Sequence, residues 1–296
     1  GLRVVELARQ VTDLPSEVSA RFWLGVGLTG IGDSTGAQQQ AAPMLAAAER
    51  LRDRYWLSTS LWYNELTALY IGDWQAARIY NERGLSVSPA DTRLLGTRTL
   101  LEHETGNFME GNEYLERFIE TLRFVAAGPR YDYAAAAQLK PVAARITEDM
   151  DRINFAEAAA GNVFSISSGT PLVSLFARQG LATIAFLRGD AEAASQQYVS
   201  LSQSAGTFAK LSNDRILGLL ARTMGNLDQA VAYFEDALTF CRQAGYRPEL
   251  AWSCHDYAEM LLESNTGDRA KAAELLEESN SISSELGMRP LVERVA

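Results

Sequence analysis

The sequence has few of the residues on which disulfide-linked and many catalytic proteins depend. Only two of its 296 residues are cysteine and only two are histidine. Two cysteines are too few for the disulfide framework of a small secreted fold, and their scarcity is typical of a protein kept in a reducing cytoplasm. Cys241 and Cys254 stand among apolar residues, so we expect both to be small core residues rather than nucleophiles.

Basic residues and long apolar runs are scarce too. The 27 Lys and Arg residues are outnumbered by 37 Asp and Glu residues, which leaves a net charge of −10. Proteins bind nucleic acids and anionic membranes through clustered Lys and Arg, so this balance argues against both partners. The longest apolar run, FWLGVGLTGIG at residues 22–32, is too short and too rich in glycine to span a bilayer, and no signal peptide is visible. We therefore expect a cytoplasmic protein that binds neither nucleic acid nor membrane.

Motifs for cofactors and catalysis are also missing. No GxxxxGKS/T phosphate loop is found. His103 lies between two glutamates that point to other faces of a helix, so we interpret it as a surface histidine. His255 and Glu259 are four residues apart and could face one metal ion, but no third ligand is in view. We expect no enzymatic activity, no metal and no cofactor.

What the sequence does contain is a repeat. A glycine followed by Asp or Asn, with a small residue five positions after the glycine, recurs at intervals of 40, 34, 83, 36 and 42 residues. The interval of 83 spans about two periods, and the pair Glu148-Asp149 near its middle predicts a degenerate copy there. The glycines of the repeat are Gly32, Gly72, Gly106, Gly189, Gly225 and Gly267.

This punctuation predicts antiparallel helix pairs. Glycine ends a helix because it tolerates the left-handed conformation, and the Asp or Asn after it can cap the next helix. Between the pairs, Gly245 precedes Pro248, and Gly287 precedes Pro290 in a near copy of the same stretch. Since proline suits the first turn of a helix, the second copy predicts a helix that begins at Pro290 and is cut at the last residue. The chain would then be a fragment of a longer protein.

The pattern resembles the tetratricopeptide repeat. That family has small residues near positions 8, 15, 20 and 27 and an aromatic residue at 24. The segment DRILGLLARTMGNLDQAVAYFEDAL matches at every position, with Gly218, Gly225, Ala230, Phe234 and Ala237. The fourth copy departs most, because Pro141 and Ile153 occupy positions for small residues, so its register around 131–168 stays open.

A narrower resemblance is strongest from Thr170 onward. TPLVSLFARQGLATIAFLRGD and SISSELGMRPLVERV are similar to the helical-repeat region of bacterial class III cyclases and LuxR-type transcription regulators. Those proteins have an AAA-like nucleotide-switch ATPase ahead of the repeats. The resemblance implies a sensor or scaffold segment of a bacterial multidomain signalling or transcription regulator. Its partner would be a protein or peptide, including the ATPase or effector domain of the same parent chain.

The predicted fold is all-α, a right-handed TPR-like α-solenoid of about seven antiparallel helix pairs in a single domain over residues 1–296. Each repeat would bury the apolar face of its neighbours. Exposed apolar faces at the two ends of the stack predict an end-to-end homodimer. The approximate repeats are 14–52, 53–90, 91–128, 129–169, 170–208, 209–246 and 247–287, with 288–296 as the start of a truncated helix.

In such a stack the first helices of the pairs line a concave groove. Counting from each turn glycine predicts groove-facing residues that mix aromatic side chains with Arg, Gln and His. Aromatic rings supply burial and Arg offers paired hydrogen bonds, which suits the docking of a peptide, a helix or a partner domain. Aromatic residues at helical spacing also commonly form a core. The candidates are Trp62, Tyr70, Arg93, His103, Gln138, Arg145, Phe176, Gln179, Arg215, Arg222, Trp252 and His255.

One kind of ligand is disfavoured, and two other functions stay open. Repeats that clamp a C-terminal carboxylate use Lys and Asn at positions 5 and 9, and this chain has pairs such as Trp62 and Leu66 there instead. One alternative is a sensor of a small-molecule effector, with a pocket near residues 131–168 that includes Tyr131, Gln138 and Arg145. The other, less favoured, is an α/α-toroid enzyme, which needs a carboxylate pair at the centre of a closed ring.

Overall fold

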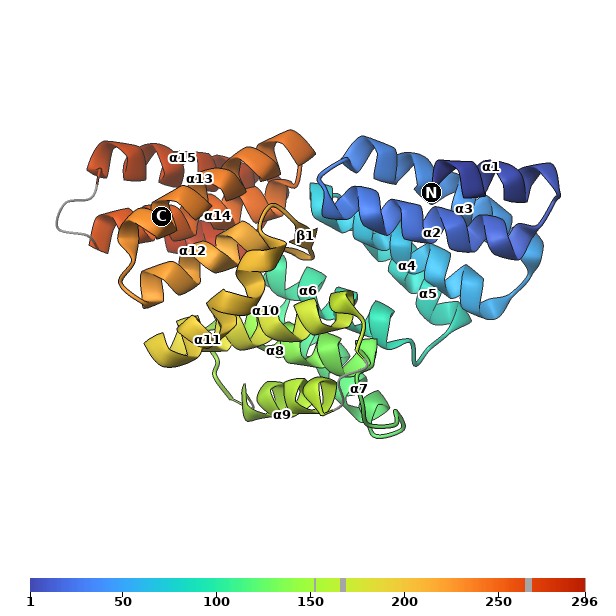
Figure 1. Cartoon of the computed structure of the whole chain (residues 1–296), viewed down its shortest axis with the longest axis horizontal. Helices are drawn as coiled ribbons and strands as arrows, with labels where there is room; N and C mark the ends of the chain where they lie inside the picture. Colours follow the sequence, from blue (N-terminus) through green and yellow to red (C-terminus); the bar gives the residue numbers. More distant parts are fainter. Residues whose placement is uncertain (152, 166–168, 264–267, 296) are drawn as a thin grey trace.

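The computed structural model describes residues 1–151, 153–165, 169–263 and 268–295, and most of them are helical (Figure 1). In this part of the chain a leading helix α1 and a trailing helix α16 flank seven antiparallel pairs, which confirms the predicted all-α, TPR-like solenoid. The helices are α1 (Leu2–Gln10), α2 (Leu14–Gly30), α3 (Ser34–Leu51), α4 (Arg54–Ile71), α5 (Trp74–Val87), α6 (Thr92–Glu104), α7 (Phe108–Leu122), α8 (Tyr131–Thr147), α9 (Ile153–Phe164), α10 (Pro171–Arg188), α11 (Ala191–Leu201), α12 (Asn213–Thr223), α13 (Leu227–Ala244), α14 (Arg247–Glu263), α15 (Arg269–Leu286) and α16 (Arg289–Val295).

The turns inside the pairs form as the punctuation predicts. Gly225, between α12 and α13, has φ +79° and so adopts the left-handed backbone that only glycine enters at little cost. In the degenerate fourth copy Glu148 takes the same role with φ +60°, between α8 and α9. A further Gly-Asn pair in this copy, Gly161-Asn162, is out of phase with the repeat and lies inside α9 rather than at a turn. Gly267 lies outside the described residues.

Aspartate and asparagine behave differently after these turns. The carboxylates of Asp33, Asp73, Asp190 and Asp268 each accept a hydrogen bond from the backbone N–H three residues later, at 2.8 to 3.0 Å. The side chains at the equivalent positions of α7 and α13, both asparagine, form no such cap. The prediction that Asp or Asn caps the second helix of each pair is therefore confirmed for aspartate but not for asparagine.

The fourth and fifth pairs pack unusually closely. A Cβ atom added to Gly180 on α10 would come within 2.0 Å of the carbonyl oxygen of Ala137 on α8. Ala134, Ala135 and Ala136 on α8 are also buried. Small side chains on α8 thus replace the larger residues of the regular repeats, and α10 rests almost directly on the backbone of α8.

The solenoid curls until its last pairs meet its first ones. The indole Nε1 of Trp74 on α5 donates to the carbonyl of Leu286 at the end of α15 (2.7 Å). The Tyr246 hydroxyl donates to the carbonyl of Thr29 in α2 (2.9 Å). Helix α14 contacts α4, and α16 contacts α6 and α8. Figure 1 shows the C-terminal pairs beside the N-terminal ones, so much of the concave side is covered.

A short hairpin interrupts the helices between α11 and α12. A 3₁₀ turn (Ser202–Ser204) is followed by β1 (Phe208–Ala209) and β2 (Leu211–Ser212), which pair antiparallel. Lys210 forms the tip with φ +63°, and β1 contacts α2 and α10. The hairpin fills part of the concave side, and sequence patterns did not predict it.

Among the described residues, no helix is both long enough and apolar enough to cross a membrane.

Candidate functional site

Among the described residues, the covered concave side contains an open groove and a deeper, smaller and more enclosed cavity. The groove has a volume of about 750 Å³ and lies between α2, α4, the start of α10 and the hairpin. Its size is that of a typical ligand-binding cleft. The aromatic residues that line it are Phe22, Trp23, Tyr55, Trp62, Tyr63, Tyr70, Tyr131, Phe176 and Phe208.

Edge-to-face contacts hold these rings in place. The ring centroids of Trp62 and Tyr131 are 5.6 Å apart, and those of Tyr131 and Phe176 are 5.7 Å apart, both at steep interplanar angles. On the other wall the rings of Tyr70 and Phe208 meet edge to face at 4.9 Å. Such pairs favour fixed orientations, so the groove presents a preformed apolar surface rather than a set of loose side chains.

The groove contains two cations in very different surroundings. Arg93 donates two hydrogen bonds to Asp91 (2.9 and 2.6 Å) and one to the Thr59 hydroxyl (2.8 Å). Burial alone would raise the pKa of Asp91, but the guanidinium of Arg93 lowers it overall. Lys210 instead places its ammonium 5.4 Å from the ring centroids of Tyr131 and Phe176. Burial lowers the pKa of Lys210 to about 8.

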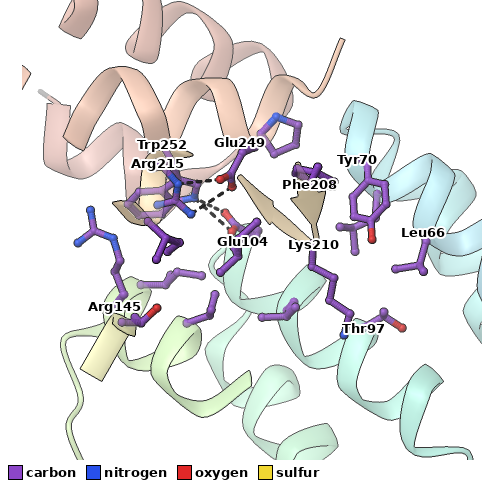
Figure 2. A pocket seen from close by; sticks show the side chains of 18 of the residues that line it. Leu66, Tyr70, Thr97, Glu104, Arg145, Phe208, Lys210, Arg215, Glu249 and Trp252 are labelled. Atoms are coloured by element: carbon purple, nitrogen blue, oxygen red, sulfur yellow. Dashed lines mark hydrogen bonds and ion pairs between the residues drawn. The ribbon is translucent and has the colours of Figure 1, made fainter. Parts of the chain in front are cut away.

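The enclosed cavity lies deeper, beyond Tyr70, Phe208 and Lys210, which line both hollows (Figure 2). Its volume is about 60 Å³, which is enough for a few water molecules but not for a metabolite of ordinary size. Residues of α4, α6, α8, α10, α12 and α14 surround it, together with the hairpin. It is therefore the place where the first helices of six different pairs converge.

A buried ion network forms one side of the cavity. Arg215 on α12 donates to both oxygens of Glu249 on α14 (2.7 and 3.1 Å) and to Asp256 (3.0 Å). Arg145 on α8 forms a further ion pair with Asp256. Burial would raise the pKa of Asp256, but Arg145, Arg215 and His255 hold it well below its usual range. The network thus joins three helix pairs through charges that are nearly all buried.

The pKa values of two other carboxyl groups are raised to near neutral pH. Trp252 Nε1 donates to both oxygens of Glu104 (3.2 and 2.9 Å), and burial raises the pKa of Glu104 to about 7. Glu65 on α4 accepts a hydrogen bond from Asn81 (2.8 Å), and burial raises its pKa to about 8. Both acids therefore titrate in the physiological range because of their surroundings.

The structure does not bring the twelve predicted groove residues together in one hollow but distributes them over several places. Trp62, Tyr70, Arg93 and Phe176 do line the open groove. Arg145, Arg215 and Trp252 line the enclosed cavity, together with Tyr70 again. Curling of the solenoid brings the C-terminal first helices onto the N-terminal ones, so these side chains face each other.

The remaining candidates are structural. Gln138 donates to Gln179 (2.6 Å), and Gln179 donates to Asn213 (2.9 Å), all buried beneath the hairpin. Arg222 is half-buried and pairs with two glutamates at the edge of α14. His255 is buried, and its Nδ1 lies 3.2 Å from a carboxylate oxygen of Asp256.

The interpretation of His103 as a surface histidine is wrong. His103 is 1% exposed, so it is neither a surface residue nor a groove residue. Its Nδ1 lies 2.8 Å from the carbonyl of Thr99, and a Cβ on Gly111 of α7 would come within 2.5 Å of that ring nitrogen. Gly111, the small residue five positions after the turn glycine Gly106, thus makes room for an imidazole, and burial lowers the pKa of His103.

The residues considered for metal binding or nucleophilic chemistry have other partners or lie in the core. No group of three or more His, Cys, Asp or Glu side chains there is arranged to hold a metal ion. Glu259, the predicted partner of His255, is paired with Arg222 at 2.9 Å. Cys241 and Cys254 are free and fully buried, as expected of core residues, and burial raises the pKa of both thiols.

The alternative pocket near residues 131–168 does not form as a unit among the described residues. Tyr131 lines the open groove, Gln138 supports the hairpin, and Arg145 borders the enclosed cavity. The toroid alternative expects two facing carboxylates at the centre. Glu104 and Glu249 do line the cavity, but Glu104 accepts a hydrogen bond from Trp252, and Glu249 accepts one from Arg215.

Sequence reasoning missed Lys210 and Phe208 because it looked for site residues on helices only. Both lie in the hairpin, outside the helical periodicity. The run FAKLSN at residues 208–213, which follows a glycine and a threonine, has no helical pattern, and this break in the helical periodicity was the signal that could have located the hairpin.

Comparison with known proteins supports one part of this architecture directly. No curated protein matches the chain. The family model of the tetratricopeptide repeat matches residues 208–283, from the hairpin to α15. This segment is therefore similar to tetratricopeptide repeats, and the described part of the chain is an all-α, TPR-like solenoid.

Proposed function

We propose that this protein is an interaction module that binds a peptide or an extended segment of a partner protein in the aromatic groove. The observation behind the proposal is the groove itself, a preformed hollow of about 750 Å³ lined by nine aromatic side chains. Tetratricopeptide repeats generally mediate protein–protein contacts, and clustered aromatic residues dominate the binding energy of such contacts. The role is binding rather than catalysis, with no nucleic acid as a direct partner.

A substitution at Gly27 tests the groove. Gly27 lies on α2, lines the groove, and has no atom within 4 Å of where its Cβ would be. Gly27→Trp therefore adds a large side chain to the wall of the groove without a clash at its base. Gly161 on α9 is equally open and exposed, so Gly161→Trp is the matched control.

The experiment selects random displayed peptides on the wild-type protein and then measures their binding to the two variants. We expect selected peptides to lose most of their affinity for Gly27→Trp and to keep it for Gly161→Trp. Circular dichroism and thermal melts check that both variants fold. Peptides that bind Gly27→Trp as tightly as wild type would show that the groove is not the binding surface.

The wider context is proposed from sequence resemblance alone. The segments from Thr170 onward support a place in a bacterial cytoplasmic signalling or transcription regulator. Partner binding would then change how the C-terminal helices rest on α4 and α6, and so bias the state of an attached ATPase or effector. The sequence of the complete parent gene tests this, since it would show whether such domains flank the repeats.

Self-association is also proposed, at the N-terminal end. Leu2, Val4, Leu7 and Val11 are all more than half exposed there, on α1 and at its C-terminal end. At the other end of the described chain, α16 packs against α6 and α8. Sedimentation at low micromolar concentration should detect a dimer, and a monomer throughout would contradict this part of the proposal.

A further inference from the structure

One cation in the groove, Lys210, forms no ion pair with any residue that the structure describes. The chain has three lysines, and Lys140 and Lys271 form ion pairs with Asp149 and Glu235. Within the described residues, the ammonium of Lys210 forms neither a hydrogen bond nor an ion pair, although it contacts two aromatic rings in the groove. An ammonium with so little compensation in a mostly apolar site favours an incoming anion.

The nearest compensating charge is weak. The negative charge of Glu65 favours the charged form of Lys210, but the carboxyl oxygens of Glu65 are not within ion-pair distance of the Lys210 ammonium. Burial raises the pKa of Glu65 to about 8, so this carboxyl group is mostly protonated near neutral pH. Glu65 therefore leaves most of the charge of Lys210 uncompensated.

The position of Lys210 is imposed by the fold around it. Its φ of +63° is unusual for a residue other than glycine. Gln138 donates to the carbonyl of Ala209 (3.3 Å), and Gln179 donates to the carbonyl of Leu211 (3.4 Å). These contacts fix the backbone on both sides of Lys210. The hairpin therefore presents this side chain at the floor of the groove at the cost of local backbone strain.

Two neighbouring donors in the groove also lack acceptors. Among the described residues, the indole Nε1 of Trp62 and the hydroxyl of Tyr131 are buried without a hydrogen-bond partner. Trp62 is 6% exposed, and its ring contacts that of Tyr131, over which Lys210 lies. An indole N–H and an ammonium can only donate. The unmet demand at this point of the groove is for an acceptor oxygen.

We infer that the groove takes a partner peptide segment in which an Asp or Glu side chain stands next to large apolar residues, with its carboxylate on Lys210. The inference rests on the proposed function. A carboxylate fits better than a phosphate group, because Arg93 is already engaged by Asp91 and only one free ammonium remains. The groove is also too large and too open to be filled by a small organic acid alone.

The same peptide selection tests this when it is repeated on Lys210→Met, Lys210→Arg and Lys271→Met. Methionine keeps the length and apolar contacts of the lysine stem, and arginine keeps the charge. Lys271 is the matched control, because it also lies over a tyrosine ring, that of Tyr257, but outside the groove. We expect peptides from the wild-type selection to be enriched in Asp or Glu beside large apolar residues.

These peptides should bind Lys210→Met roughly 10-fold to 100-fold more weakly, the range expected for loss of a hydrogen bond between charged groups. Their affinity for Lys210→Arg should largely remain, and that for Lys271→Met should not change. Peptides that depend on the groove but lack acidic enrichment would overturn this inference and leave the proposed function standing. If no peptide is selected, the proposed function fails instead.

A titration with a small carboxylic acid tests the remaining alternative, that the site binds a small molecule instead of a peptide. Calorimetric titration with 4-phenylbutyrate asks whether an aromatic carboxylate alone occupies the site. Binding of this acid that depends on Lys210, in the absence of any selected peptide, would identify a small-molecule site and overturn the peptide inference.

Discussion

The buried ion network makes a strong prediction about stability, centred on Arg215. This side chain is 4% exposed and donates three hydrogen bonds to Glu249 and Asp256. Arg215→Met keeps most of the apolar stem but removes the charge. Asp256 keeps Arg145 as a partner, whereas Glu249 keeps only the backbone N–H of Ser212 (2.7 Å). The variant therefore leaves one buried carboxylate without a counter-ion.

Removing one partner of a buried ion pair typically costs 3–5 kcal/mol, so we expect a loss of about 4 kcal/mol in the free energy of unfolding. Urea denaturation followed by circular dichroism measures it. Burial already raises the pKa of Glu249, and loss of Arg215 raises it further. Protonation of Glu249 relieves the penalty, so the deficit should be smaller at pH 5 than at pH 8.

Two comparisons make this prediction refutable. Arg188 and Glu157 form an ion pair whose side chains are 39% and 37% exposed, so Arg188→Met should cost less than about 1 kcal/mol. The double variant Arg215→Met, Glu249→Met removes both charges and should be more stable than Arg215→Met alone. A loss below about 1 kcal/mol for Arg215→Met, or no recovery in the double variant, would show that the network does not hold the interior together.

Three further substitutions test other parts of the account. Glu104→Gln should stabilise the protein by up to about 3 kcal/mol at pH 8. The pKa of Glu104 is about 7 in the folded state against an ordinary 4.5, so ionisation of the unfolded chain between these values destabilises the folded wild type as pH rises. The gain in the free energy of unfolding should vanish below pH 4.5. Gly180→Ala should cost more than about 2 kcal/mol, because its Cβ would meet a main-chain oxygen of α8, whereas Gly161→Ala in open space should be neutral or stabilising. Asp190→Ala should cost about 1 kcal/mol by removing a helix cap, whereas Asn226→Ala, which removes no capping bond, should cost less.

Each of these has a clear contradicting result. A Glu104→Gln variant whose stability follows the wild type from pH 4 to 8 would mean that Glu104 is ionised in the folded protein. A tolerated Gly180→Ala would mean that α8 and α10 can separate without loss. Equal costs for Asp190→Ala and Asn226→Ala would show that the aspartate cap adds nothing to stability.

Much of the fold could be predicted because the repeat is written in local signals. Gly225 and Gly287 end helices for a reason that depends only on backbone geometry, and Asp33 caps a helix through a bond to a residue three positions away. Even the degenerate turn at Glu148 could be located, because the period of the repeat demanded it. Interactions within a few residues of each other leave their marks in the sequence.

The site could be predicted only in part, because it depends on the total curvature of the solenoid. Small differences in how each pair packs on the next add up over seven pairs, so the total curvature cannot be predicted from any single residue. Trp62 and Phe176 were identified correctly as groove residues, but the same counting placed Arg215 and Trp252 in a groove when they lie in a closed interior. Lys210 was missed because its hairpin has no helical period.

The central claim is that the aromatic groove between α2, α4, the start of α10 and the hairpin is the surface that binds a partner. Hydrogen–deuterium exchange, measured with and without a saturating peptide selected on the wild-type protein, tests it most directly. The account predicts slower exchange in α2, in α4 and in residues 204–212, with little change in the outer helices α3, α5, α13 and α15. Protection confined to those outer helices, with exchange in the groove unchanged, would contradict it.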